Sequence, residues 1–191
     1  PDVANPAAVD TLAWLRTAGV PVVLLERDAM VGNDPKPFES VNTDHLVGVQ
    51  TAVSHLVDLG HHRIGLVLGL SPHSDDIQVA FERTCPTFGI DAELPRHHGD
   101  RPDFFEDHQV LDALLSDWAD AGVTALLVHG DREAISIAQH CDRRGLSIPD
   151  DLSIVSYDDE IAGLFSPALT AIRPPRTSLG RAAVELMAAR L

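Results

Sequence analysis

Residues 41–68 read VNTDHLVGVQTAVSHLVDLGHHRIGLVL, an amphipathic helical pattern followed at once by an apolar run. The helix is predicted over residues 44–59, with Thr43 as its N-cap and Gly60 where helices commonly end in a left-handed residue. Its apolar stripe consists of Leu46, Val49, Val53 and Leu56. Residues 64–68 lack polar alternation, which predicts a strand covered on both faces. A helix leading into such a strand is the repeating unit of a parallel α/β sheet.

The same alternation continues on both sides of this stretch. Further helices are predicted over residues 7–18, from residue 75 to before Pro86, and over residues 104–119, 131–144 and 177–190. The side chains expected to face inward are Ala134, Ile137, Ala138 and Cys141 on the helix 131–144, and Leu179, Ala183, Leu186 and Met187 on the helix 177–190. Further strands are predicted over residues 20–25, 125–128 and 152–156. Ligands of parallel sheets bind beyond the carboxyl ends of the strands. The turns after Leu68, Val128 and Ser156 are therefore the first places to expect a binding site.

The composition limits the classes of partner. The 191 residues include 29 acidic and 14 basic side chains, for a formal charge of −15. Such a polyanion is repelled by phosphate backbones, so these residues are not expected to bind DNA directly. The two cysteines form no CxxC pair, which argues against a disulfide framework. No apolar run approaches the roughly 20 residues that span a membrane. No signal peptide is visible before the first helix, and the chain starts without methionine, so we expect a fragment or a processed product.

Motifs of common enzymes are missing from the sequence. There is no GxSxG elbow, no GxGxxG after a strand, no Walker A loop and no HExxH. The ten histidines include the doublets His61-His62 and His97-His98, whose adjacent side chains point in different directions on a helix or strand. Hydrogen-bonded or solvated histidines are the favoured interpretation, so neither a metal site nor a cofactor is predicted.

Acidic residues occupy three positions next to predicted elements. Asp158 and Asp159 directly follow a predicted strand, Asp131 begins a predicted helix, and Asp44 lies in a predicted first turn. Carboxylates at such places can serve as acids or bases, bind a metal, or accept hydrogen bonds from ligand hydroxyls. They can equally cap a helix or fold a turn, and the residues alone favour this structural alternative.

Several stretches together resemble the lactose-repressor/galactose-repressor (LacI/GalR) family of bacterial transcription regulators. They are residues 19–23, 41–67, 145–159, 167–174 and 179–183, including the pieces GHHRIGLV and LSIPDDLSIVSYDD. The resemblance implies an α/β fold of the type I periplasmic-binding-protein-like kind, with two Rossmann-like lobes and parallel sheets. The first lobe would be incomplete and hold residues 1–65 plus 173–191, and the second would hold residues 66–172. The helix-turn-helix head would be absent.

The resemblance also implies a set of effector-binding residues. Asp44 matches an effector-contacting acid, and Asp158 matches the acid after the last strand of the second lobe. Asp131 follows the position of an Asn that is Gly130 here. His73 falls in a loop that commonly contacts the ligand, and Arg101 falls where an aromatic residue often stacks on sugar. We therefore expect Asp44 and Asp158 to face each other from opposite lobes.

Other positions depart from the family pattern. An Arg-x-x-Gly pattern is replaced by residues 77–80, His45 replaces a common Asn, and Pro174 replaces a frequent polar residue. A buried ligand hydroxyl without a partner costs about 1–3 kcal/mol. An ordinary hexose is therefore a poor candidate, and we hypothesise an atypical effector or none.

The family resemblance predicts a cytoplasmic, non-enzymatic sensor domain that binds a small molecule and reaches operator DNA only through the missing head. A homodimer is expected, formed by the helix that holds Ala134 and Ile137 and the loop that holds Leu164 and Phe165. Two alternatives remain at this point. One is an extracytoplasmic solute-binding protein of the same fold, and the other is an α/β enzyme that uses Asp158 or Asp131 as a base.

Overall fold

The computed structural model describes residues 6–27, 38–91, 96–99 and 103–191, and the chain divides into two compact units. Unit 1 comprises Pro1–Asp44 and Pro175–Leu191, and unit 2 comprises His45–Pro174. The sequence placed the first boundary near residue 65 instead. The difference arises because the helix after Asp44 buries its apolar stripe in the core of unit 2, which ties residues 45–65 to that unit.

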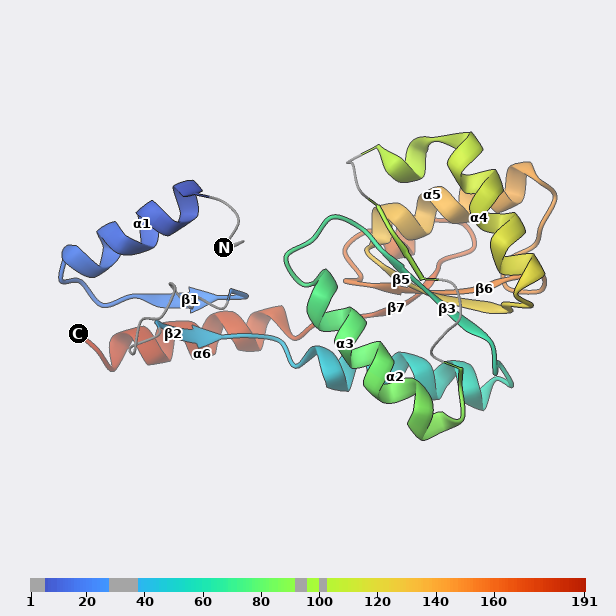
Figure 1. The fold of residues 1–191 in the computed structure, drawn as a ribbon. Coiled ribbons are helices and arrows are strands. Elements are labelled where there is room, and N and C mark those ends of the chain that lie inside the picture. Colours follow the sequence, from blue (N-terminus) through green and yellow to red (C-terminus); the bar gives the residue numbers. More distant parts are fainter. Residues whose placement is uncertain (1–5, 28–37, 92–95, 100–102) are drawn as a thin grey trace. The chain divides into compact units, whose positions relative to one another are not determined.

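Unit 2 is built on a five-stranded, fully parallel sheet (Figure 1). Its strands are β3 (Ile64–Leu68), β4 (Arg96–His98), β5 (Ala125–His129), β6 (Ser153–Tyr157) and β7 (Thr170–Ile172), in the spatial order β4-β3-β5-β6-β7. Every residue of β3, β5 and β6 is buried, as predicted for strands covered on both faces. The α/β class with parallel sheets is confirmed.

Helices cover both faces of this sheet. The pair α2 (His45–Asp58) and α3 (Ser74–Thr84) packs on one face, and the pair α4 (His108–Asp120) and α5 (Asp131–Arg143) packs on the other (Figure 1). Three short 3₁₀ helices complete the unit: η1 (Cys85–Phe88), η2 (Phe104–Glu106) and η3 (Ala162–Leu164). The residues predicted to face inward on α5 are all buried, namely Ala134, Ile137, Ala138 and Cys141.

The core of unit 2 lies between these layers. Its largest fully buried side chains include Trp118 of α4, Tyr157 of β6 and Phe81 of α3. Complete burial of a large apolar side chain contributes about 1.5–3 kcal/mol. The core therefore fixes the positions of the strand ends, on which the candidate site is built.

Unit 1 contains α1 (Pro6–Thr17), β1 (Val23–Leu25), β2 (Glu39–Val41) and α6 (Arg176–Ala188). The two strands pair in parallel, and Arg190 forms an ion pair with Glu39 at the end of α6. Of the residues predicted to be buried on α6, only Leu179 is, because α6 borders an open apolar hollow of ≈ 420 Å³. This hollow is lined by Val23, Leu25, Ala183, Val184, Met187, Ala188 and Leu191.

Three strands and one helix start differ from the sequence-based prediction. The strands β2, β4 and β7 have three residues each, too few for a recognisable apolar pattern. The helix predicted from residue 104 begins at His108 instead. Asp107 accepts hydrogen bonds from the backbone N–H groups of Gln109 and Val110, at 2.9 and 3.4 Å, and so caps α4.

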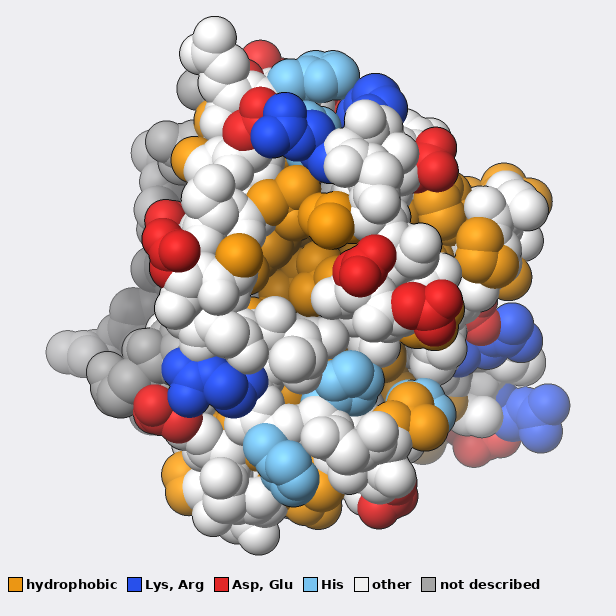
Figure 2. Space-filling view, turned by 90° about the vertical axis from the view of Figure 1, so that its right-hand side faces the viewer, with side chains coloured by type: hydrophobic (Ala, Val, Ile, Leu, Met, Phe, Trp, Pro, Cys, Tyr) orange, Lys and Arg blue, Asp and Glu red, His pale blue; other side chains and the backbone are white. Residues whose placement is uncertain are grey.

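The surface of unit 2 mixes charged and apolar groups. On the face at the right of Figure 1, hydrophobic side chains gather in a hollow with acidic, basic and histidine side chains around it (Figure 2). Among the apolar side chains of unit 2, Leu164 is 82% exposed. None of the described helices combines the length and the apolar character needed to cross a membrane.

Candidate functional site

The carboxyl edge of the unit 2 sheet brings together three of the five residues that the sequence singled out. The strands β3, β5 and β6 are direct neighbours and end at Leu68, His129 and Tyr157. Each of the three turns expected to form a site therefore opens at this edge, within one residue of the predicted position. His73 lies at the N-cap of α3, Asp131 begins α5, and Asp158 follows β6. This edge is the candidate functional site.

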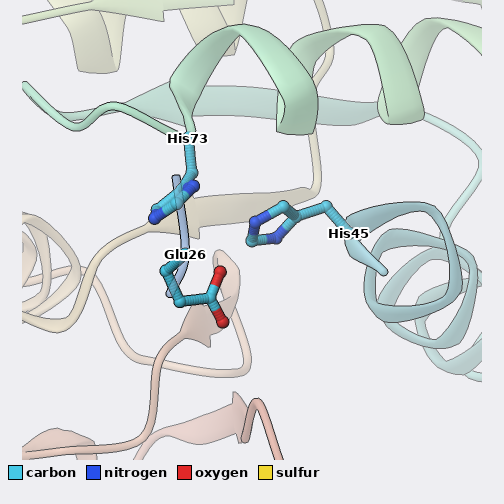
Figure 3. Close-up of side chains that lie close together, drawn as sticks. All are labelled: Glu26, His45 and His73. Atoms are coloured by element: carbon cyan, nitrogen blue, oxygen red, sulfur yellow. The ribbon is translucent and has the colours of Figure 1, made fainter. Parts of the chain in front are cut away.

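Two imidazoles from different elements lie side by side at this edge. His45 belongs to the first turn of α2 and His73 precedes α3, and their rings reach toward each other with centroids 4.9 Å apart (Figure 3). The Nδ1 atom of His45 lies 3.2 Å from the hydroxyl of Tyr157. Tyr157 is buried at the end of β6, so this hydrogen bond fixes the orientation of the His45 ring against the sheet.

His129, the last residue of β5, is a buried and neutral base next to these two histidines. Its side chain packs edge-on against Tyr157, with 5.7 Å between ring centroids, and the residue is only 4% exposed. Burial, and after it the neighbouring His45 and His73, lowers the pKa of His129 to about 4. Its Nε2 atom lies 3.8 Å from an Asp158 carboxylate oxygen, and its Nδ1 has no hydrogen-bond partner among the described residues. His129 therefore adds polarity to the site without adding charge near neutral pH.

The turn after β6 holds Asp158 in an unusual backbone conformation. Asp158 has φ 111° and Asp159 has φ 51°, both in the left-handed region, which Asp tolerates better than most residues. The N–H of Asp158 donates to the carbonyl of Ile172 at 2.9 Å, which ties the turn to β7. Asp159 forms an ion pair with Arg173 at 2.6 Å. Asp158 is half-buried at the edge, as expected for an acid that accepts hydrogen bonds from a ligand.

Asp131 has a different role, because protein donors occupy both of its oxygens. Oδ1 accepts from the Ser156 hydroxyl at 2.5 Å, and Oδ2 accepts from the backbone N–H groups of Glu160, Ile161 and Ala162 at 2.6, 2.7 and 3.1 Å. Burial alone would raise the pKa of Asp131, but these hydrogen bonds outweigh it and lower the pKa. This geometry favours the structural alternative that the sequence left open, with Asp131 as the anchor of the turn after β6.

Two predicted site residues are not part of the described unit 2 edge. Arg101 falls outside the described residues. Asp44 is exposed and is the last residue of unit 1 before α2, so its expected position opposite Asp158 stays a prediction. Thr43 was predicted as the N-cap of α2. Its hydroxyl instead donates to the Glu26 carboxylate, which follows β1 in unit 1.

Sequence reasoning missed His129 and Tyr157 and recorded His45 only as a departure from the family pattern. His129 and Tyr157 were assigned to predicted strands or to the turns that follow them, because the neighbouring acidic residues were the more obvious candidates for a site. Their positions as the last residues of β5 and β6 were the available clue, since strand ends face the ligand side of a parallel sheet.

The histidine doublets diverge as predicted. His97 packs edge-on against Trp118 with 5.5 Å between centroids, whereas His98 lies 2.8 Å from the side-chain oxygen of Gln78 on α3. His61 lies 2.9 Å from the Thr124 hydroxyl, and its neighbour His62 is exposed. Each doublet thus divides its two rings between different surroundings.

The close packing of α2 on Tyr157 leads to a first prediction, at Gly48. A methyl group added there would lie far inside the van der Waals contact distance of the Tyr157 hydroxyl oxygen and 3.0 Å from the Cζ atom of Tyr157. Gly48→Ala should therefore lower the free energy of unfolding by about 1–2 kcal/mol, because overpacking outweighs the gain in helix propensity. Chemical denaturation followed by circular dichroism measures this change.

The matched control is Gly180→Ala in α6, where the added methyl would meet no atom within 4 Å. There, alanine should stabilise the helix by about 0.5–1 kcal/mol. Stabilisation of both variants would contradict the packing of Tyr157 described above.

Comparisons with known proteins agree with this fold. Residues 53–191 match a family model described as a periplasmic binding protein-like domain. A similar structure is that of a LacI-family regulatory protein from Chloroflexus aggregans, with a TM-score of 0.78 and 26% identity over 93% of this chain and 63% of that one.

Curated relatives are transcription regulators. An uncharacterised HTH-type regulator of Streptomyces limosus is 32% identical over 90% of this chain and 48% of its own length. The HTH-type regulator MalR of Streptomyces coelicolor is 31% identical over 91% of this chain and 50% of its own length. The chain thus spans about half the length of these relatives. It belongs to the periplasmic binding protein-like domain family and is similar to LacI-type regulators, as its sequence motifs indicated.

Proposed function

We propose that this chain is the effector-sensing domain of a bacterial LacI-family transcriptional repressor. A small molecule binds at the carboxyl edge of the unit 2 sheet and controls operator binding by a DNA-binding segment outside this chain. The observation that carries the proposal is the convergence of His45, His73, His129 and Asp158 at one strand edge of a domain whose relatives are regulators. The named relatives give no support to an extracytoplasmic solute-binding protein.

The side chains at the edge define the chemistry of the effector. Asp158 supplies carboxylate acceptors, and the imidazoles of His45 and His73 supply groups that can donate or accept. Asp131 contributes no acceptor, because its oxygens are held by the turn after β6. The site suits a small polar molecule with a hydroxyl or amino group directed at Asp158. A hexose needs several hydrogen-bond partners for its hydroxyl groups, and this site offers few of them. The effector of this proposal is therefore an atypical one.

The turn after β6 provides a route from effector binding to the rest of the domain. Asp158 lies on this turn, and Asp131 holds the backbone of residues 160–162 from the first residue of α5. An effector that binds Asp158 more tightly in one conformation of the turn shifts the equilibrium toward that conformation. The same coupling free energy then changes operator affinity, by thermodynamic linkage.

The test is calorimetric titration of the full-length protein against hexoses, nucleobases and amino compounds. For any compound that binds, Asp158→Asn should weaken binding about 10- to 100-fold, as expected for a lost charge-assisted hydrogen bond. Asp150→Asn is the matched control, because Asp150 is exposed in the turn before β6. Micromolar binding of a plain hexose would count against an atypical effector. If Asp158→Asn bound the effector as tightly as the wild type, Asp158 would not be part of the effector site.

The proposed regulator is a cytoplasmic homodimer without enzymatic activity. The sequence assigned part of the dimer contact to the helix that holds Ala134 and Ile137; these two side chains are buried in the core, so any contact by α5 would use its other side chains. The loop holding Leu164 remains suited to the contact, because this large apolar side chain is 82% exposed. Analytical ultracentrifugation of the full-length protein measures the oligomeric state.

A further inference from the structure

We propose that His45 and His73 bind a divalent transition-metal ion of the Zn²⁺ class through one imidazole nitrogen each. Imidazole is a preferred ligand of Zn²⁺, Ni²⁺ and Cu²⁺. Nothing in the family match or in the names of the relatives assigns a metal to this edge of the sheet. The sequence argued against metal on the basis of adjacent histidine doublets, whereas this pair joins residues that are remote in sequence.

The geometry of the pair suits two ligands of one ion. A ring nitrogen of His45 and one of His73 lie within 4.8 Å of each other. Two nitrogens at about 2.0–2.1 Å from a tetrahedral Zn²⁺ are separated by roughly 3.3 Å. Closing this difference requires rotation of the half-buried His73 side chain at the start of α3, while His45 stays in its hydrogen bond to Tyr157. Figure 3 shows the two rings converging from their separate elements.

The surroundings of His45 resemble the outer shell of a metal site. Histidine ligands commonly hold one ring nitrogen in a hydrogen bond to an oxygen while the other nitrogen binds the ion. In His45, Nδ1 lies 3.2 Å from the Tyr157 hydroxyl, and this hydroxyl is fixed by the buried ring of Tyr157. The Nε2 atom would then be the ligand. When Nδ1–H donates to the Tyr157 oxygen, the lone pair of Nε2 is left for the ion, and the same bond holds the ring in place.

The charges around the pair also favour a cation. His129, the imidazole closest to the core, is neutral near pH 7 because burial lowers its pKa to about 4, so it does not repel the ion. Asp158 lies 3.8 Å from His129 and brings a negative charge to the same edge. Water molecules complete the coordination of the ion, so the site does not depend on the effector of the proposed function.

The experiment is calorimetric titration of ZnCl₂ into the EDTA-treated and dialysed protein, with no effector present. The wild type should bind one Zn²⁺ with micromolar affinity, and His45→Asn or His73→Asn should each weaken that binding at least about tenfold. His62→Asn is the matched control, because it removes an exposed imidazole from a doublet and should leave the affinity unchanged.

Two results would overturn the proposal. One is the same Zn²⁺ affinity in the wild type and in His73→Asn, and the other is loss of binding in His62→Asn, which would identify the doublet as the ligand. Thermal melts check that the variants fold. His73 makes no side-chain cap bond on α3, and Asn is a favourable N-cap residue, so His73→Asn should fold. Because no effector is present, failure of the metal site leaves the proposed effector site untouched.

Discussion

Replacement of Asp131 by Ala should lower the free energy of unfolding by about 4 kcal/mol, the largest effect expected in unit 2. The variant removes a buried carboxylate and leaves four donors without their acceptor: the Ser156 hydroxyl and the N–H groups of residues 160–162. Hydrogen bonds to a charged group contribute about 1.5–3 kcal/mol each, and unsatisfied buried donors add to the loss. Some donors regain water in the variant, so the total is smaller than the sum.

Urea denaturation measures this change, with Asp142→Ala as its control on the same helix. Asp142 is exposed, so its replacement should change the stability by less than about 0.5 kcal/mol. Hydrogen exchange adds a local readout, because the amides of Glu160, Ile161 and Ala162 should lose protection in the Asp131 variant. Retention of that protection would show that another group holds the turn.

The second large effect is a loss of stability in mild acid caused by His129. Its pKa is about 4 in the folded protein and near 6.5 in the unfolded chain, so the unfolded chain binds more protons between these values. Stability due to this histidine is therefore fully present above pH 6.5 and falls as the pH is lowered toward 4. The loss reaches about 2 kcal/mol at pH 5 and about 3 kcal/mol below pH 4.

Denaturation midpoints between pH 4 and pH 7 test this prediction. His129→Gln cannot be protonated, so its stability should vary less with pH across this range than that of the wild type. Asp131 acts in a separate window, because its lowered pKa gives stability that is lost only as the pH falls below about 4. Equal slopes for the wild type and His129→Gln above pH 4 would contradict the buried, neutral state of this histidine.

The sequence predicted the layers of unit 2 well because its signals there are long and regular. The stripe of α2 and the buried runs of β3, β5 and β6 carry enough apolar residues to identify each element. The three-residue strands β2, β4 and β7 do not, because their positions depend on neighbours far away in the sequence. The first boundary differs between the sequence-based prediction and the compact units for a related reason. The apolar pattern along the chain located α2, but it does not reveal whether this helix packs into the core of unit 1 or of unit 2.

The site was predicted by position more accurately than by role. The rule that ligands bind at strand ends located Asp158 and the turns around it, yet it treated Asp131 and Asp158 alike. Their difference comes from tertiary contacts, since residues 160–162 return to Asp131 but leave Asp158 at the edge. The pair of His45 and His73 likewise becomes visible only when the sheet brings α2 and α3 together.

Asp131 holds the turn after β6 in a way that leaves the side chains of this turn free to change during evolution. The contacts to residues 160–162 are made through main-chain N–H groups, which every residue except proline possesses. Side chains at Glu160 and Ile161 can therefore be exchanged while the loop keeps its shape. The rim of the candidate site can therefore vary in sequence, because its support is independent of the amino acids it carries.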